Sequence, residues 1–194
     1  QLINGRHFTE MEACDVIYSV TTALVALHRA GITHGHVHPR NVWIESSGKS
    51  RLWCDPLSLI APIRWELSET SETLDRADYA APELAKPNVQ PDTRTDVYAM
   101  GCLFFRLLTG HVPFSGGDLA SKLTRHGTDI GSSLDALDIN AATIDCLMHM
   151  MAKRREDRYN TAQELLATLQ GIVNRTSTMS TFDSKNQQAT KTSK

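Results

Sequence analysis

Three histidines alternate with glycine and valine over residues 34–38 of this chain. His34, His36 and His38 would share one face if the stretch were an extended strand, because alternate side chains of a strand point the same way. Three imidazoles on one face, with Asp55 nearby, are ligand types that bind Zn²⁺ and could activate a water molecule. The spacing therefore leaves open a zinc hydrolase. A compact loop in place of the strand would remove the shared face.

The same histidines begin a series of short motifs that follow one another along the chain. The motifs are His34-Gly35-His36-Val37-His38-Pro39-Arg40-Asn41, Cys54-Asp55-Pro56-Leu57, Ala81-Pro82-Glu83, Asp96-Val97-Tyr98-Ala99-Met100-Gly101, Leu107-Leu108-Thr109-Gly110-His111-Val112-Pro113-Phe114 and Arg158. Their order resembles that of the C-terminal (large) lobe of protein kinases, with bacterial, eukaryotic-like serine/threonine kinases as the nearest group. The resemblance implies a mainly helical fold (α+β as part of the whole kinase fold), with a small β-hairpin and without the small N-terminal lobe.

The resemblance also implies structural roles for four residues. His34 is the loop histidine that packs into the core. Glu83 and Arg158 would form a buried ion pair that ties the activation segment to the lobe. Asp96 would accept backbone N–H bonds from the catalytic loop and hold its shape. These positions keep the residue types of the family.

The catalytic positions depart from the family pattern. His36 stands where the family has the aspartate that accepts the substrate proton, and His38 stands where it has the loop lysine. Gly35 replaces the arginine that contacts an activating phosphate. The magnesium-binding motif reads Asp55-Pro56-Leu57, and its proline fixes φ. The pattern therefore indicates a pseudokinase that acts in regulation or scaffolding, with a weakly active serine/threonine kinase fragment as the alternative.

Two polar residues of the nucleotide site remain. Asn41 and Asp55 occupy the positions of the family's magnesium ligands, so both are candidates for cofactor and metal binding. We find no glycine-rich phosphate loop and no strand lysine, and we expect no cofactor for this chain alone. ATP and Mg²⁺ are expected if an intact small lobe is present, and His36, His38 and Asn41 are the candidate catalytic residues.

Charge and composition limit the classes of partner that this chain is expected to bind. A net charge of −2 gives no reason to expect nucleic acid, and no apolar run is long enough to cross a membrane. Four scattered cysteines and the absence of a secretory signal favour a cytoplasmic location. A large lobe alone would expose the apolar floor of its cleft, so we expect an upstream small lobe or a protein partner to cover it.

Apolar spacing places these motifs on a helical frame. Thr9 and Glu12 form a capping-box pattern and Gly31 ends the helix that follows. Expected helices span residues 9–30, 96–108, 119–123 and 141–152, with a last helix from Thr161. A hairpin is expected over 42–44 and 52–54, and the proline-rich residues 55–95 are expected to be irregular, with a short helix near Glu83. The kinase-like domain would span residues 1–173, followed by a disordered polar tail over 174–194.

Overall fold

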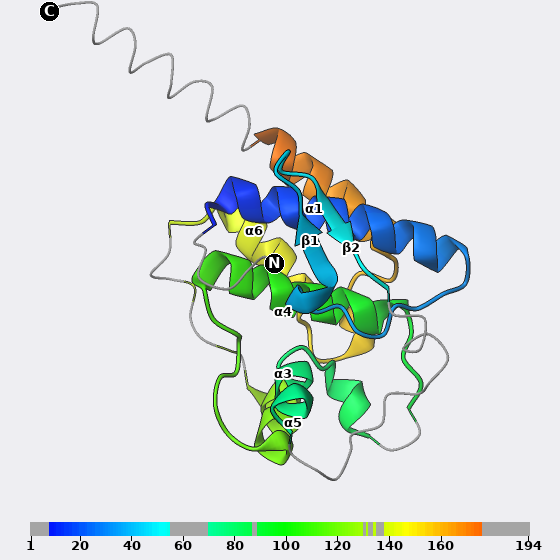
Figure 1. Cartoon of the computed structure of the whole chain (residues 1–194), viewed down its shortest axis with the longest axis vertical. Coiled ribbons are helices and arrows are strands. Elements are labelled where there is room, and N and C mark those ends of the chain that lie inside the picture. The colour runs from blue at the N-terminus through cyan, green and yellow to red at the C-terminus, as the bar shows by residue number, and fades with distance from the viewer. Residues whose placement is uncertain are drawn as a thin grey trace, which may run out of the picture.

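The computed structural model describes residues 8–54, 70–86, 89–129, 131, 134 and 138–175. Two long helices, α1 (Glu10–Arg29) and α4 (Thr93–Thr109), lie against each other through the middle of the molecule (Figure 1). Helix α1 begins at the expected capping box, in which the Thr9 side chain accepts from Glu12 N–H and the Glu12 carboxylate accepts from Thr9 N–H. It ends before Gly31, whose φ of 74° requires a residue without a Cβ penalty.

Helix α4 is the centre of the apolar core. It begins three residues before the expected start, because Asp92 and Thr95 form a reciprocal cap there and Asp96 lies inside the first turn. Helix α6 (Ala141–Met150) packs against it so closely that a Cβ on Gly101 would lie 2.6 Å from Met151 Cγ. The α4–α6 contact therefore depends on a glycine at position 101.

A two-stranded antiparallel hairpin lies across α1. Strands β1 (Val42–Ile44) and β2 (Ser50–Leu52) pair with Val42 opposite Leu52. The second strand begins two residues before the expected 52–54, since the turn closes at Glu45 and Lys49. Alternation puts Val42 inside, whereas Trp43 and Trp53 face outward and are 53% and 61% exposed.

Three short elements form the lower part of Figure 1. They are α3 (Ser71–Ala77), the 3₁₀ turn η2 (Pro82–Ala85) and α5 (Leu119–Thr128). Helix α3 was not expected, because the prolines of residues 55–95 suggested an irregular chain. The helix forms because its own stretch of that segment contains no proline. The turn η2 is the expected short helix near Glu83. Helix α5 begins at the Asp118 cap, as its expected start requires. It extends five residues beyond the expected end, to Thr128.

A further helix occupies residues 162–175 and packs on the α1 side of the molecule. Thr161 accepts from Glu164 N–H, as the capping pattern predicts. Residues 174 and 175 are helical, and residues 176–194 of the expected tail lie outside the described part. With the small hairpin, this arrangement confirms the predicted mainly helical fold class.

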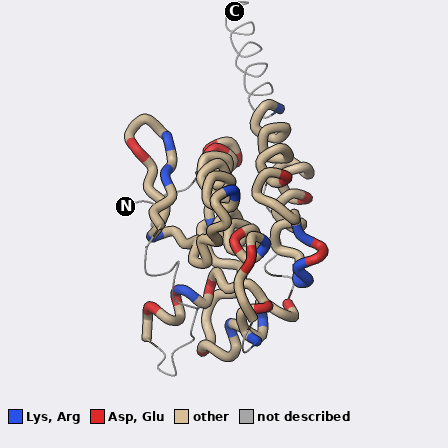
Figure 2. The backbone as a smooth tube through the Cα atoms, turned by 90° about the vertical axis from the view of Figure 1, so that its right-hand side faces the viewer, with Lys and Arg blue, Asp and Glu red and all other residues tan. Residues whose placement is uncertain are grey.

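Charge is mixed over the surface, with basic and acidic segments interspersed along the hairpin and the lower helices (Figure 2). Within the described ranges, no helix combines the length and hydrophobicity that a membrane span requires.

Candidate functional site

A buried carboxylate at the start of α4 supports the loop that carries the three histidines. Asp96 accepts backbone N–H bonds from His34 at 2.8 Å and from Gly35 at 2.7 Å. The His28 Nε2 of α1 lies 2.8 Å from the same carboxylate and donates to it. One side chain thus holds together α1, α4 and the loop, which is the structural role expected for Asp96.

A second buried group joins η2 to the segment before the last helix. Arg158 donates from two nitrogens to the two Glu83 oxygens at 3.0 and 2.8 Å, and Thr95 Oγ1 donates to Glu83 at 3.0 Å. Burial tends to raise the Glu83 pKa, but the hydrogen bonds and charge of Arg158 hold it below its usual value. The expected ion pair is therefore present. Arg155, at 3.4 Å from Glu83, was not foreseen as a further partner.

His34 connects the loop to the end of the hairpin. Its ring is fully buried, its Nε2 lies 3.0 Å from the Trp53 carbonyl oxygen, and its Nδ1 accepts from His36 N–H at 3.2 Å. A carbonyl can only accept, so the proton is assigned to Nε2. His34 thus has the packing role expected of the loop histidine.

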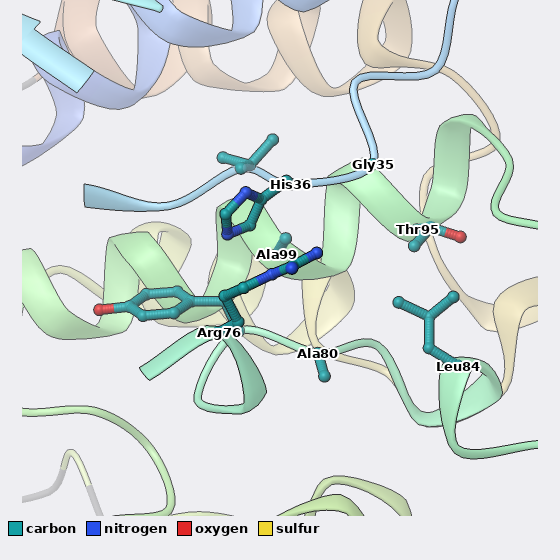
Figure 3. Close-up of a pocket in the computed structure, with 9 residues that line it drawn as sticks. Gly35, His36, Arg76, Ala80, Leu84, Thr95 and Ala99 are labelled. Atoms are coloured by element: carbon teal, nitrogen blue, oxygen red, sulfur yellow. The ribbon is translucent and has the colours of Figure 1, made fainter. Parts of the chain in front are cut away.

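His36 lies over a small cavity between the loop and α3, opposite Arg76 (Figure 3). Its Nε2 is buried and has no hydrogen-bond partner among the described residues. Burial, followed by the nearby charge of Arg76, lowers the His36 pKa to about 3. The imidazole is therefore neutral near pH 7 and a weak proton acceptor, and it supplies no fixed negative charge.

His38 lies beside His36, with 5.5 Å between the ring centroids. Its Nδ1 accepts from Arg40 N–H at 3.1 Å, and its Nε2 lies 3.4 Å from Asp75, a distance at which attraction is mostly electrostatic. Burial lowers the His38 pKa to about 4, and this effect exceeds the opposing attraction of Asp75. His38 therefore carries little positive charge at neutral pH, unlike the lysine of the family.

Helix α3 brings Asp75 and Arg76 to the loop, and the sequence reasoning missed both. Asp75 also pairs with Arg40 at 2.9 Å. The signal was present in the sequence: Thr70 caps the helix by accepting from Thr73 N–H, and Leu74 and Ala77 have helical spacing.

Of the two candidate magnesium ligands, Asn41 lies within the described residues. Asn41 lies at the end of η1 (Pro39–Asn41), and its Nδ2 donates to the His36 carbonyl at 2.9 Å, so that only its Oδ1 can contact a cation. Asp55 lies outside the described residues. Of the two candidate ligands, Asn41 Oδ1 is therefore the oxygen that the described residues supply.

The zinc hypothesis is not supported. The positive φ of Gly35, 71°, breaks the extended geometry on which the shared face depended. Both His34 ring nitrogens are already in hydrogen bonds, and no group of three histidine, cysteine or acidic side chains within the described ranges could hold a metal ion. We therefore set aside the zinc hydrolase with His34, His36 and His38 as ligands.

Comparison with known proteins gives a consistent picture. A family model described as protein kinase domain matches residues 1–169. The chain is 31% identical over 169 residues to the probable serine/threonine-protein kinase PknB of Corynebacterium glutamicum, covering 84% of this chain and 26% of that protein. It is 30% identical to the PknB of Mycobacterium tuberculosis, covering 86% and 27%. With the PknL of that organism it shares 33% identity, covering 81% and 40%. The chain thus spans about a quarter of the length of the PknB relatives.

Proposed function

Because this chain belongs to the protein kinase family, we propose that it forms a kinase-like large lobe with a degraded catalytic loop and acts in regulation or scaffolding through protein contact. The observation that carries the proposal is the state of His36. At the position of the family's catalytic aspartate, the chain has a neutral, half-buried imidazole whose pKa is lowered to about 3 by burial and by Arg76. A well-placed general base accelerates proton transfer by about 10²–10⁴, and this ring is a poor substitute for one.

The neighbouring positions support the same proposal. His38 replaces a permanent cation with a ring whose pKa is about 4. Helix α3 lies against the loop, where Asp75 contacts both His38 and Arg40. The framework of Asp96, Glu83 and Arg158 is intact, so the loop keeps its shape without the charges that phosphate transfer uses.

The proposal also includes ATP binding, the exposed surface of the hairpin and the location of the protein. We expect no tight ATP binding by the chain alone, because its sequence has no glycine-rich phosphate loop and no strand lysine. Trp43 and Trp53 leave indole surface exposed on the hairpin, which favours coverage by a small lobe or a protein partner. We retain the expected cytoplasmic location as part of the proposal.

The test is transfer of labelled phosphate from ATP, by the chain and by a longer natural polypeptide that contains it. We expect no transfer above background from either, and no micromolar ATP binding by the chain in calorimetry. In the longer polypeptide, the variant His36→Asp should gain activity relative to the native sequence, whereas His111→Asp, an exposed site away from the loop, should not. Ordinary kinase turnover of about 1–100 s⁻¹ that is lost in His36→Ala would overturn the proposal.

A weakly active serine/threonine kinase is the second candidate. It is favoured by the intact support beneath the loop and by retention of Asn41 next to it. In this case, the longer polypeptide would transfer phosphate slowly in the native form, and Asn41→Ala would abolish the residual rate.

A further inference from the structure

The cavity beneath His36 is lined by residues of the loop, of α3, of η2, of α4 and of the segment between α3 and η2 (Figure 3). Gly35 and His36 come from the loop, Arg76 comes from α3, and Thr95 and Ala99 come from α4. In the close-up, the Arg76 side chain extends across the cavity below Gly35 and His36. A cation therefore lies beside the ring that replaces the family's carboxylate.

Within the described residues, the Arg76 guanidinium makes no hydrogen bond or ion pair. Carboxylates of α3, of its C-cap, of η2 and of α4 are each bound by another basic side chain. The pairs are Asp75 with Arg40, Asp78 with Lys122, Glu83 with Arg158 and Asp96 with His28. Arg76 therefore has no carboxylate partner among the residues that the structure describes.

His36 has a second unmet requirement. In the part of the chain that the structure describes, its Nε2 is buried without a partner, and buried polar atoms in folded proteins nearly always have one. As a neutral ring, it can place its single proton on Nε2 and donate to an acceptor. A cation and a free donor on one cavity are suited to the same ligand, which is an anion.

We propose that this cavity binds the carboxylate of an aspartate or glutamate side chain presented by a protein partner. The cavity has room for about one water-sized group, so one carboxylate oxygen can enter while the rest of the side chain stays at the mouth. A phosphate, with three terminal oxygens, fits less well. Compared with the family pattern, the site has changed from an acceptor of a hydroxyl proton into a donor toward an acidic group.

This inference rests on the proposed function, because it specifies what a partner would present to the loop. The probes are acetate and two capped alanine pentapeptides, one with a central glutamate and one with a central glutamine. Each is titrated into the 194-residue chain while NMR follows the His36 ring. Acetate should shift the His36 signals saturably, and the glutamate peptide should bind at least about tenfold more tightly than the glutamine peptide, since bonds to charged groups are the strong ones.

The variant Arg76→Gln should lose about tenfold or more of this affinity while keeping the wild-type circular dichroism spectrum. Arg51→Gln makes the same charge change at an exposed hairpin arginine and should bind as the wild type does. An equal loss of affinity in both variants would mean that the probes respond to the net charge of the protein, and would overturn the inference. Unchanged His36 signals in the presence of the probes would mean that the cavity binds no carboxylate, and would also overturn it. Tighter binding of acetate than of the glutamate peptide would overturn the assignment to a protein partner. Phosphate transfer by the native sequence would overturn the proposed function but not a carboxylate response that depends on Arg76.

Discussion

The support beneath the histidine loop and the loop itself differ in how their polar groups are paired. In the support, Asp96 accepts from three donors and Glu83 from Arg158 and Thr95. In the loop, His36 Nε2 has no partner and His38 Nε2 reaches Asp75 only at 3.4 Å. The groups that maintain the shape of the loop are paired, whereas burial lowers the pKa of both loop imidazoles and keeps them neutral near pH 7. The two regions should therefore respond differently to substitution, and the free energy of unfolding measures the difference.

The largest effect is expected at Arg158. The variant Arg158→Met leaves the Glu83 carboxylate without its main partner and removes bonds to the carbonyls of Ala152 and Lys153. We expect the free energy of unfolding to fall by about 3–5 kcal/mol, as for other broken buried ion pairs. Urea denaturation followed by far-UV circular dichroism measures the change. Arg154→Met, at an exposed arginine, is the control and should cost little; equal losses would remove the distinction between buried and surface pairs.

A smaller effect is expected at Asp96. The variant Asp96→Asn keeps the shape but loses the charge that accepts from His34, Gly35 and His28. We expect a loss of about 1.5–3 kcal/mol in the same experiment, the value of hydrogen bonds to charged groups. The exposed Asp145→Asn should be neutral. A neutral Asp96→Asn would show that the loop does not depend on its support.

The next prediction concerns acid. Burial and the charge of Lys153 lower the His126 pKa to about 3 in the folded state, so between pH 6.5 and 3 the unfolded chain binds a proton there that the folded chain does not. The free energy of unfolding therefore falls as pH drops below about 6.5, by about 1.4 kcal/mol per pH unit for each such histidine. His126→Phe should remove the contribution of one histidine to this dependence of the free energy of unfolding on pH between pH 7 and 5. An unchanged slope would contradict the assignment, and the exposed His111→Phe serves as the control.

The smallest effect is expected at Asp75 of α3, which pairs with Arg40 of the loop. The ion pair of Asp75 with Arg40 is largely exposed on the arginine side, at 66%, so Asp75→Asn should cost about 0.2–1 kcal/mol. Salt should shrink the difference further, because exposed pairs are screened. The test is urea denaturation at low and high salt. A loss as large as that of Asp96→Asn would mean that α3 helps to hold the loop in place.

The sequence was most informative where local rules decide the structure. The Thr9–Glu12 cap and the Gly31 end follow from residue type and order, whereas the Glu83–Arg158 pair was implied by the resemblance to kinases. It was least informative around α3, where the prolines of the wider segment concealed a seven-residue helix with its own Thr70 cap. That Arg76 has no carboxylate partner among the described residues could not be foreseen, because this depends on which carboxylates tertiary packing gives to other basic side chains. The low pKa of His36 likewise arises from burial, which no spacing reveals.

The outward-facing indoles of the hairpin have an optical consequence. Two of the protein's three tryptophans, Trp43 and Trp53, sit in water on one face, away from the helical core. Their fluorescence should therefore emit at long wavelength in the folded chain and report poorly on melting of the core. A binding partner or small lobe that covers this face would shift the emission to the blue without any added label.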